Sequence, residues 1–218
     1  MYTLLSGLYK YLTEKDEYFV LILGLDNAGK TTFLESAKTR LTPHYKGANL
    51  SKITTTVGMN LGKIDVNGVR LNFWDLGGQE ELQSLWDKYY EECHAVIYVV
   101  DSGDRERVEE SKAAFDKMIK NETIKGIPLL VAANKQDLAD CMGVREVKHL
   151  FENNAEVRHY RGCPLILKNA LFQELNSREL MTLATSGLTG EGVEEGIEWV
   201  ADTALRNSGL RPPHEATR

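Results

Sequence analysis

Short apolar segments alternate with longer amphipathic segments along most of the chain. Continuous apolar runs at residues 18–23, 95–100 and 129–133, and a weaker run at 180–185, predict buried β-strands. Apolar side chains recur at helical spacing in three sets: Val108, Phe115, Met118 and Ile119; Val144, Val147, Leu150 and Phe151; and Val193, Ile197, Val200, Ala204 and Leu205. Strands that alternate with helices in this way predict a parallel sheet with helices on both faces.

One pair of strands departs from this alternation. Residues 61–66 and 69–74 flank Asn67-Gly68, a pair typical of a two-residue type I′ turn. We therefore predict an α/β protein with a mostly parallel six-stranded sheet and one antiparallel edge strand. In such sheets, ligands bind at the loops that follow the carboxyl ends of the strands.

Composition mainly excludes other classes of protein. The chain has 218 residues, enough for one domain with a substantial core. A net charge of −6, with acidic and basic residues interspersed, argues against a nucleic-acid partner. Cys93, Cys141 and Cys163 lack metal-ligand spacing and indicate reduced cytosolic thiols. No apolar stretch approaches the roughly 20 residues that span a bilayer, and the N-terminus lacks a signal-peptide pattern.

The loop after the first predicted strand has the full phosphate-binding pattern G-x-x-x-x-G-K-[ST]. Its glycines permit backbone angles at which successive N–H groups face inward and cradle phosphate oxygens at a helix N-terminus. We expect Lys30 to reach the outer phosphates and the Thr31 hydroxyl to ligate Mg²⁺. A helix is predicted over residues 32–41, and Pro43 stops it. The predicted nucleotide ligands here are Gly24, Leu25, Asp26, Asn27, Ala28, Gly29, Lys30, Thr31 and Thr32.

A second motif, Asn134-Lys135-Gln136-Asp137, follows the strand at 129–133 and indicates guanine. The Asp137 carboxylate can accept hydrogen bonds from N1–H and the 2-amino group of guanine, and adenine offers no such pair of donors. Lys135 can lay its alkyl stem along the base. The predicted base ligands in this motif are Asn134, Lys135 and Asp137.

The last base contact depends on a choice of register. The loop can be read as Leu183-Ala184-Thr185-Ser186-Gly187 or as Ser186-Gly187-Leu188. The distance back from Gly192 favours the second, so we predict Ser186 and Gly187 as ligands, with the Gly187 N–H facing the guanine carbonyl oxygen.

Two further segments carry groups suited to the reacting end of a triphosphate. Asp75-Leu76-Gly77-Gly78-Gln79 follows the second strand of the hairpin. Asp75 can hold Mg²⁺ through water, Gly78 can present its N–H to the γ-phosphate, and Gln79 can orient an attacking water. Thr56, in the polar segment before the hairpin, can add its hydroxyl to Mg²⁺ when GTP is bound. The predicted cofactor is therefore Mg²⁺, with GTP or GDP as the ligand.

In this order and spacing, the motifs resemble those of the small GTPases, and within them the Arf family. The resemblance covers nearly the whole chain and implies the P-loop NTPase, or small G-protein, fold. The Arf-like features are Asp26 and the segments Thr56-Val57-Gly58-Met59-Asn60, Trp74-Asp75-Leu76-Gly77-Gly78-Gln79 and Leu85-Trp86-Asp87-Lys88-Tyr89-Tyr90. Residues 1–7 together with 80–90 look most like the Arf-related subfamily.

The resemblance also implies roles for particular residues. Thr56 would be the switch threonine and Gln79 the catalytic glutamine. Met59, Trp74 and Tyr89 would form an exposed hydrophobic triad that effectors read, although the family usually has phenylalanine in place of Met59.

By the same resemblance, the chain is a monomeric switch that hydrolyses GTP and regulates trafficking at Golgi and trans-Golgi membranes. It would be cytoplasmic and peripherally membrane-associated, with an exchange factor, a GTPase-activating protein and GTP-state effectors as partners. No motif fixes an arginine beside the catalytic segments, so we expect slow hydrolysis without a partner. An unpaired Asp26 carboxylate would slow it further by repelling developing charge. Two rival functions stay open: a GTP-binding scaffold with negligible hydrolysis, and an ATP-dependent phosphotransferase.

The GTPase domain is predicted to span residues 17–206. Residues 1–16 predict a weakly amphipathic helix, with apolar residues on one face, that lies on a membrane or packs on the domain. Tyr2 excludes N-myristoylation and the last residues exclude prenylation, so the resemblance implies recruitment by a membrane receptor. Residues 156–179 are expected to be an insertion: a lineage-specific segment, a partner site or a gene-model artefact. Residues 207–218 are predicted to be disordered. The apolar face of the predicted helix consists of Leu4, Leu5, Leu8 and Leu12.

Overall fold

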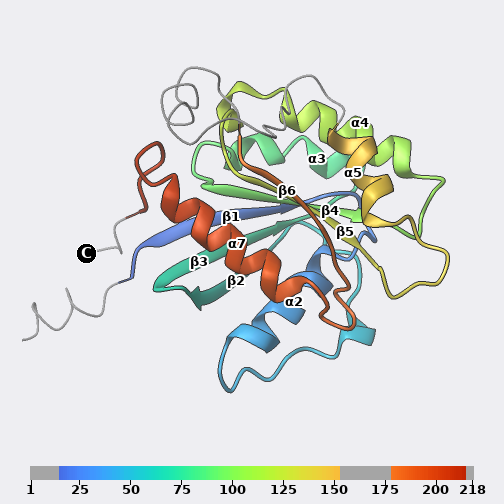
Figure 1. Cartoon of the computed structure of the whole chain (residues 1–218), viewed down its shortest axis with the longest axis horizontal. Helices are drawn as coiled ribbons and strands as arrows, with labels where there is room; N and C mark the ends of the chain where they lie inside the picture. The colour runs from blue at the N-terminus through green and yellow to red at the C-terminus, as the bar shows by residue number, and fades with distance from the viewer. Residues whose placement is uncertain (1–14, 153–177, 215–218) are drawn as a thin grey trace, which may run out of the picture.

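A computed structural model describes residues 15–152 and 178–214, which form a six-stranded sheet between layers of helices (Figure 1). The strands are β1 (Glu17–Leu23), β2 (Met59–Val66), β3 (Val69–Leu76), β4 (Ala95–Asp101), β5 (Leu129–Asn134) and β6 (Leu180–Ala184). The α-helices of this part are α2 (Lys30–Leu41), α3 (Glu80–Gln83), α4 (Val108–Ile119), α5 (Val144–Glu152) and α7 (Val193–Arg206). The connections contain the 3₁₀ turns η1 (Leu50–Lys52), η2 (Trp86–Tyr89) and η3 (Glu122–Ile124).

The strand order is β2-β3-β1-β4-β5-β6, and neighbouring strands run parallel except β2 and β3. This confirms the predicted mixed sheet with one antiparallel edge strand. Asn67 (φ 49°) and Gly68 (φ 81°) both have positive φ, as a type I′ hairpin turn requires. Because the central strands are parallel, the loops after β1, β4 and β5 open on the same edge of the sheet.

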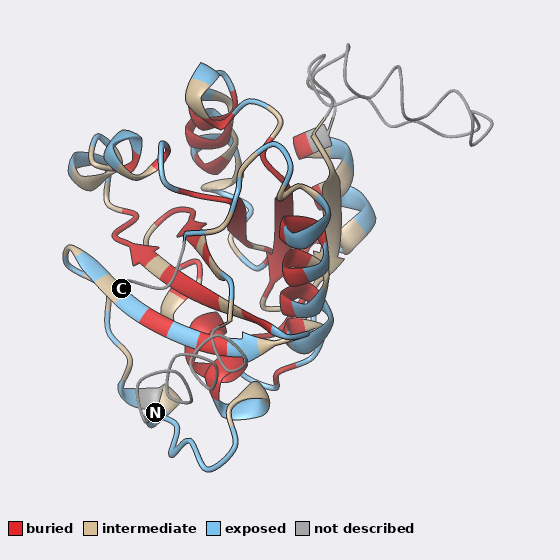
Figure 2. Cartoon of the chain, turned by 90° about the vertical axis from the view of Figure 1, so that its left-hand side faces the viewer, coloured by how far each residue is buried: buried red, intermediate tan, exposed pale blue. Residues whose placement is uncertain are grey.

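Helices cover both faces of the sheet (Figure 1). α4 and α5 bury Phe115 and Phe151 against one face, with the two rings edge to face at 5.1 Å. α2 and α7 bury Phe33 and Ile197 against the other face. Figure 2 shows buried residues concentrated in the central strands and on the inner sides of the helices, while the outer sides are exposed. The central strands therefore give a rigid base to the loops that follow them.

Two details differ from the sequence predictions. Leu205 is 43 % exposed rather than buried, because it lies one residue, or about 100°, beyond Ala204 around α7. Residues 207–214 are not disordered but pack against the start of β1 and the turn before β4. Arg211 donates to the carbonyls of Tyr90 (2.9 Å) and Cys93 (2.8 Å), and the segment ends in an antiparallel bridge to β1.

Several predictions lie wholly or partly outside the described residues. The structure does not describe residues 1–14, 153–177 and 215–218. These ranges contain nearly all of the predicted N-terminal helix, nearly all of the insertion predicted near 156–179, and the end of the predicted tail. In the part of the chain that the structure describes, no helix has the length and apolar character that crossing a membrane requires.

Candidate functional site

The loop between β1 and α2 is shaped to enclose anionic oxygens. Gly24 (φ 136°) and Gly29 (φ 92°) adopt backbone angles that other residues rarely reach. Lys30 is buried at the start of α2, and its ammonium donates to the carbonyls of Gly24 (3.0 Å) and Leu25 (2.7 Å). Burial lowers the pKa of Lys30 to about 8, against the charges of Asp75 and Asp26, which raise it. A desolvated ammonium of this kind is a strong ligand for phosphate, whose negative charge favours its protonated form.

Residues from other segments hold Asn27 and Ala28 of the loop in place. Asn27 has a positive φ of 59°, and its side-chain oxygen accepts a hydrogen bond from the Thr55 hydroxyl at 3.3 Å. The Ala28 carbonyl accepts a hydrogen bond from the Asn134 amide at 2.8 Å. Thr32 is half-buried in the first turn of α2. The loop is therefore fixed in shape by contacts that leave its inner side to a ligand.

Three oxygen-bearing side chains converge beside Lys30. The Thr31 hydroxyl donates to Asp75 Oδ2 at 2.6 Å and lies 2.6 Å from Thr56 Oγ1. They come from α2, from the segment before β2, and from the carboxyl end of β3. The structure thus brings together the three predicted metal ligands, which stand 25 and 44 residues apart in sequence.

This donor set fits Mg²⁺. Asp75 is fully buried, and its Oδ1 has no hydrogen-bond partner among the described residues. Burial raises the pKa of Asp75, opposed by the Thr31 hydroxyl and the Lys30 charge, so a divalent cation would favour its ionised form. In the described ranges no group of three or more His, Cys, Asp or Glu forms a metal cluster. Hydroxyls, one carboxylate and phosphate oxygens are the usual magnesium environment.

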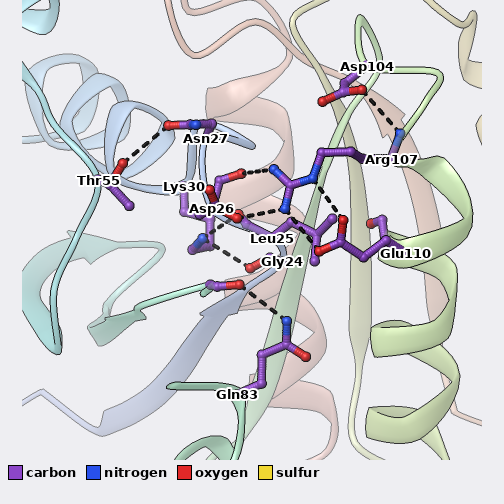
Figure 3. A network of polar contacts seen from close by, with 12 residues as sticks. Gly24, Leu25, Asp26, Asn27, Lys30, Thr55, Gln83, Asp104, Arg107 and Glu110 are labelled. Atoms are coloured by element: carbon purple, nitrogen blue, oxygen red, sulfur yellow. Dashed lines mark hydrogen bonds and ion pairs between the residues drawn. The ribbon is translucent and has the colours of Figure 1, made fainter. Parts of the chain in front are cut away.

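The segment after β3 passes directly against the phosphate loop. A Cβ on Gly78 would lie 2.3 Å from the Gly24 carbonyl oxygen and 2.5 Å from the Asp26 amide nitrogen, so only glycine permits this approach. Gln79 follows as the N-cap residue that precedes α3. Gln83, which the motifs did not single out, donates from Nε2 to the Gly78 carbonyl at 3.2 Å (Figure 3). The sequence feature that could have indicated Gln83 is its position four residues, or about one helical turn, after Gln79.

Asn134 joins the phosphate loop to the predicted base loop. While its amide nitrogen reaches Ala28, its Oδ1 accepts a hydrogen bond from the Gly187 N–H at 2.9 Å. The next residue, Lys135, has a positive φ of 65° and pairs with Asp101 at 2.6 Å. This pairing fixes the lysine stem at the carboxyl ends of β4 and β5, where a base would stack.

The contacts favour the chosen register for the last base loop. The Ser186 hydroxyl donates to Asp137 Oδ1 at 2.5 Å. In the rival register, Ala184 belongs to β6 and the Thr185 N–H donates to the Ala133 carbonyl within the sheet. The Gly187 N–H, however, is engaged by Asn134, so its contact with guanine stays a prediction.

An arginine approaches the phosphate loop, which no motif indicated. Arg107 Nη2 donates to Asp26 Oδ1 at 2.7 Å, and the same guanidinium contacts Glu110 through Nε at 2.8 Å (Figure 3). The hydrogen bond from Arg107 is the largest cause that lowers the pKa of Asp26. The expected repulsion by an unpaired Asp26 carboxylate therefore needs correction, because the carboxylate is paired.

The predicted effector triad is only partly exposed. Met59 is 42 % exposed, whereas Trp74 and Tyr89 are half-buried, with their rings 5.2 Å apart. Met59 and Tyr89 also line a hollow of about 170 Å³, together with Leu82 and Leu85. Met59 and Tyr89 thus border a small depression beside the segment after β3, and Trp74 reaches this group through its ring contact with Tyr89.

The sheet topology, the phosphate loop at the head of α2 and the paired base loops define a P-loop GTPase of the small G-protein class. A solved structure of the Arl6 BBS3 small GTPase from Trypanosoma brucei, with a bound nucleotide analogue, is similar with a TM-score of 0.67 and 30 % identity. The match covers 87 % of this chain and 98 % of that one.

Sequence comparisons identify the family. The model of the ADP-ribosylation factor family matches residues 4–204. ADP-ribosylation factor-related protein 1 is 57 % identical in Bos taurus and 56 % in Homo sapiens, over 99 % of this chain and 98 % of theirs. ADP-ribosylation factor-like protein 3 of Saccharomyces cerevisiae is 42 % identical over 98 % of both chains. The chain belongs to the ADP-ribosylation factor family and is a GTP-binding switch that hydrolyses GTP.

Proposed function

We propose that this switch recruits effectors in its GTP state at Golgi and trans-Golgi membranes, and so regulates vesicle-mediated protein transport. The resemblance of residues 1–7 and 80–90 to the Arf-related subfamily supports this assignment. The partners of such a cycle are an exchange factor, an activating protein and GTP-state effectors. Residues 1–16 and a membrane receptor supply the peripheral membrane association.

The observation that carries the proposal is that the proposed metal ligand Asp75 and two of the proposed effector residues, Met59 and Trp74, share one hairpin. Asp75 and Trp74 are consecutive on β3, and Met59 pairs with Leu76 in the adjoining ladder. A change in the side chains around the nucleotide would therefore move the strands that present Met59 and Trp74, while Tyr89, on η2, packs against Trp74. Binding of GTP at one end of the hairpin would thereby change the surface that Met59 and Trp74 present to an effector.

Within the site, we assign each predicted residue a role. Lys30 and the backbone of the phosphate loop hold the phosphates, while Thr31, Thr56 and Asp75 hold Mg²⁺, the last through water. The metal supplies neutralisation of phosphate charge when bound. Gln79 orients the attacking water, and Gly78 donates its N–H to the γ-phosphate.

The test compares two variants that trap opposite states. Gln79→Leu should remain GTP-bound and collect effectors, because no side-chain amide orients the water. Thr31→Asn should favour the GDP or empty form, because it loses a magnesium-ligating hydroxyl. Chromatography of the bound nucleotide, single-turnover hydrolysis and imaging of Golgi-marker overlap give the readouts. Equal hydrolysis by wild type and Gln79→Leu, or equal Golgi overlap of both variants, would contradict the proposal.

A further inference from the structure

The pair formed by Asp26 and Arg107 joins two elements on either side of the site. Asp26 lies in the phosphate loop, and Arg107 immediately precedes α4 (Figure 3). Their contact is 2.7 Å long, and the two side chains are 25 % and 33 % exposed. A second guanidinium nitrogen, Nη1, points at the Asp26 backbone carbonyl at 3.5 Å. Arg107 therefore faces both the charge and the peptide of this loop residue.

The guanidinium is itself oriented before it reaches the loop. The carboxylate of Glu110, one turn along α4, accepts hydrogen bonds from Arg107 Nε at 2.8 Å and from Arg107 Nη2 at 3.0 Å. At the backbone, the Arg107 N–H donates to Asp104 Oδ1 at 3.2 Å, which fixes the start of the helix. A planar fork held on one edge by a carboxylate presents its remaining donors in a fixed direction. These contacts orient the Arg107 side chain toward Asp26.

The orientation of Arg107 affects phosphate binding because Asp26 carries a negative charge. A carboxylate in a phosphate-binding loop repels the anion that the loop binds, and at distances of several ångströms in a partly buried site this repulsion is substantial. The guanidinium, which Asp26 shares with Glu110, offsets that charge at 2.7 Å. It also ties the loop to α4, which packs on the sheet through Phe115.

We propose that Arg107 is a positioning residue that prolongs the residence of the bound guanine nucleotide by compensating Asp26 and holding the loop against α4. The inference rests on the phosphate-binding role proposed above for residues 24–31. Removing the guanidinium leaves an uncompensated carboxylate beside the phosphates and speeds nucleotide release. Removing the carboxylate as well takes away the repulsion and slows release again.

The experiment measures dissociation of a fluorescent GDP from the full chain, in magnesium buffer with excess unlabelled GDP, for wild type, Arg107→Gln, Asp26→Asn and the double variant. We expect Arg107→Gln to release the nucleotide roughly tenfold faster, and the double variant to return most of the way to wild type. Arg107→Lys should fall between, since it keeps the charge but loses the fork. Arg105→Gln is the matched control, because Arg105 pairs with Glu146 on α5.

The outcomes separate the two ideas. If wild type does not bind the fluorescent GDP, the role of the phosphate loop fails. If it binds and Arg107→Gln releases it within twofold of wild type or of Arg105→Gln, the inference about Arg107 is overturned. A faster release that Asp26→Asn does not correct also overturns it, because a purely structural defect would behave that way. Thermal unfolding of the GDP-bound variants identifies any that fail to fold.

Discussion

Gly78 is the position at which a single added methyl group has the most direct consequence for the switch. A Cβ added to Gly78 would lie only 2.3 Å from the Gly24 carbonyl oxygen and 2.5 Å from the Asp26 amide nitrogen. Both neighbours are backbone atoms, so Gly78→Ala must push the segment away from the phosphate loop. We predict that affinity for a non-hydrolysable GTP analogue falls about tenfold or more, since overlap of this kind costs about 1–3 kcal/mol. Affinity for GDP, which has no γ-phosphate for Gly78 to contact, should fall much less.

Gly143→Ala is the control for that substitution. A Cβ at Gly143 meets no atom within 4 Å, and its φ lies outside the left-handed region. Equilibrium titration with fluorescent GDP and GTP analogues measures both variants. Equal losses of affinity for the two nucleotides in Gly78→Ala would show that the segment does not distinguish them.

At the same scale, sequence reasoning succeeded where a short motif fixes the chemistry. The Thr31, Thr56 and Asp75 side chains converge as predicted, because each follows from the position of its loop relative to the sheet edge. Arg107 was missed because its partner, the Asp26 carboxylate, is distant in sequence. Gln83 was missed because its partner is a nearby backbone carbonyl, that of Gly78, which no motif marks. Charge complementarity across 81 residues leaves no local pattern to read.

Among the elements, the segment after α7 depends on one histidine. The buried His94 accepts a hydrogen bond from the Phe19 N–H at its Nδ1 (3.0 Å) and donates from Nε2 to the Pro212 carbonyl (3.0 Å). An N–H can only donate and a carbonyl can only accept, so this geometry selects the neutral ring. Burial lowers the pKa of His94; the hydrogen bond to the Pro212 carbonyl opposes this, and the nearby His214 and Arg211 add to it.

This geometry predicts a loss of stability on mild acidification. The folded-state pKa lies below the unfolded value of about 6.5, so below that pH the unfolded chain binds more protons. The stability contributed by His94 is therefore full above about pH 6.5 and is lost as the pH falls through the folded pKa. His94→Gln, which can accept and donate in similar places without titrating, should show a smaller loss.

Urea unfolding of the GDP-bound protein at pH 7.5, 6.5 and 5.5 measures this difference. His44→Gln, at an exposed position, should follow the wild-type pH dependence. If His94→Gln loses stability in parallel with wild type, the acid sensitivity comes from other groups. The ring contact of His214 with Phe19, with centroids 4.9 Å apart, would be the next candidate.

The elements themselves were largely predictable. Continuous apolar runs identified the buried strands, and Asn67-Gly68 identified the hairpin, because each signal is local. The order of residues 207–214 was not predictable from composition, since Pro212-Pro213 and polar neighbours also describe a free tail. What orders them is Arg211, whose guanidinium satisfies carbonyls of a turn that is far away in sequence.

For the whole molecule, the start of the described chain is tied to the same hairpin that carries Met59 and Trp74, two of the proposed effector residues. Lys15 pairs with Asp65 at 3.2 Å, and the Arg70 N–H donates to the Asp16 carbonyl at 2.9 Å. The Arg70 side chain contacts Asp65 (2.8 Å) and Glu17 (3.5 Å). A shift of the hairpin on nucleotide exchange therefore bears on the point at which residues 1–14 join the domain.

This linkage predicts that membrane association requires both the N-terminal residues and the GTP state. We expect the apolar face predicted at Leu4, Leu5, Leu8 and Leu12 to supply the membrane or receptor contact, since burial of such a face in a membrane would be worth several kcal/mol. Full-length chain loaded with a non-hydrolysable GTP analogue should co-sediment with isolated Golgi membranes. Deletion of residues 1–12 should reduce the bound fraction roughly tenfold or more while leaving nucleotide content unchanged. The GDP-loaded full chain is the matched control, and protease-treated membranes separate a receptor from the lipid. Persistent recruitment of the deletion variant would contradict the prediction, because the folded domain would then hold the membrane by itself.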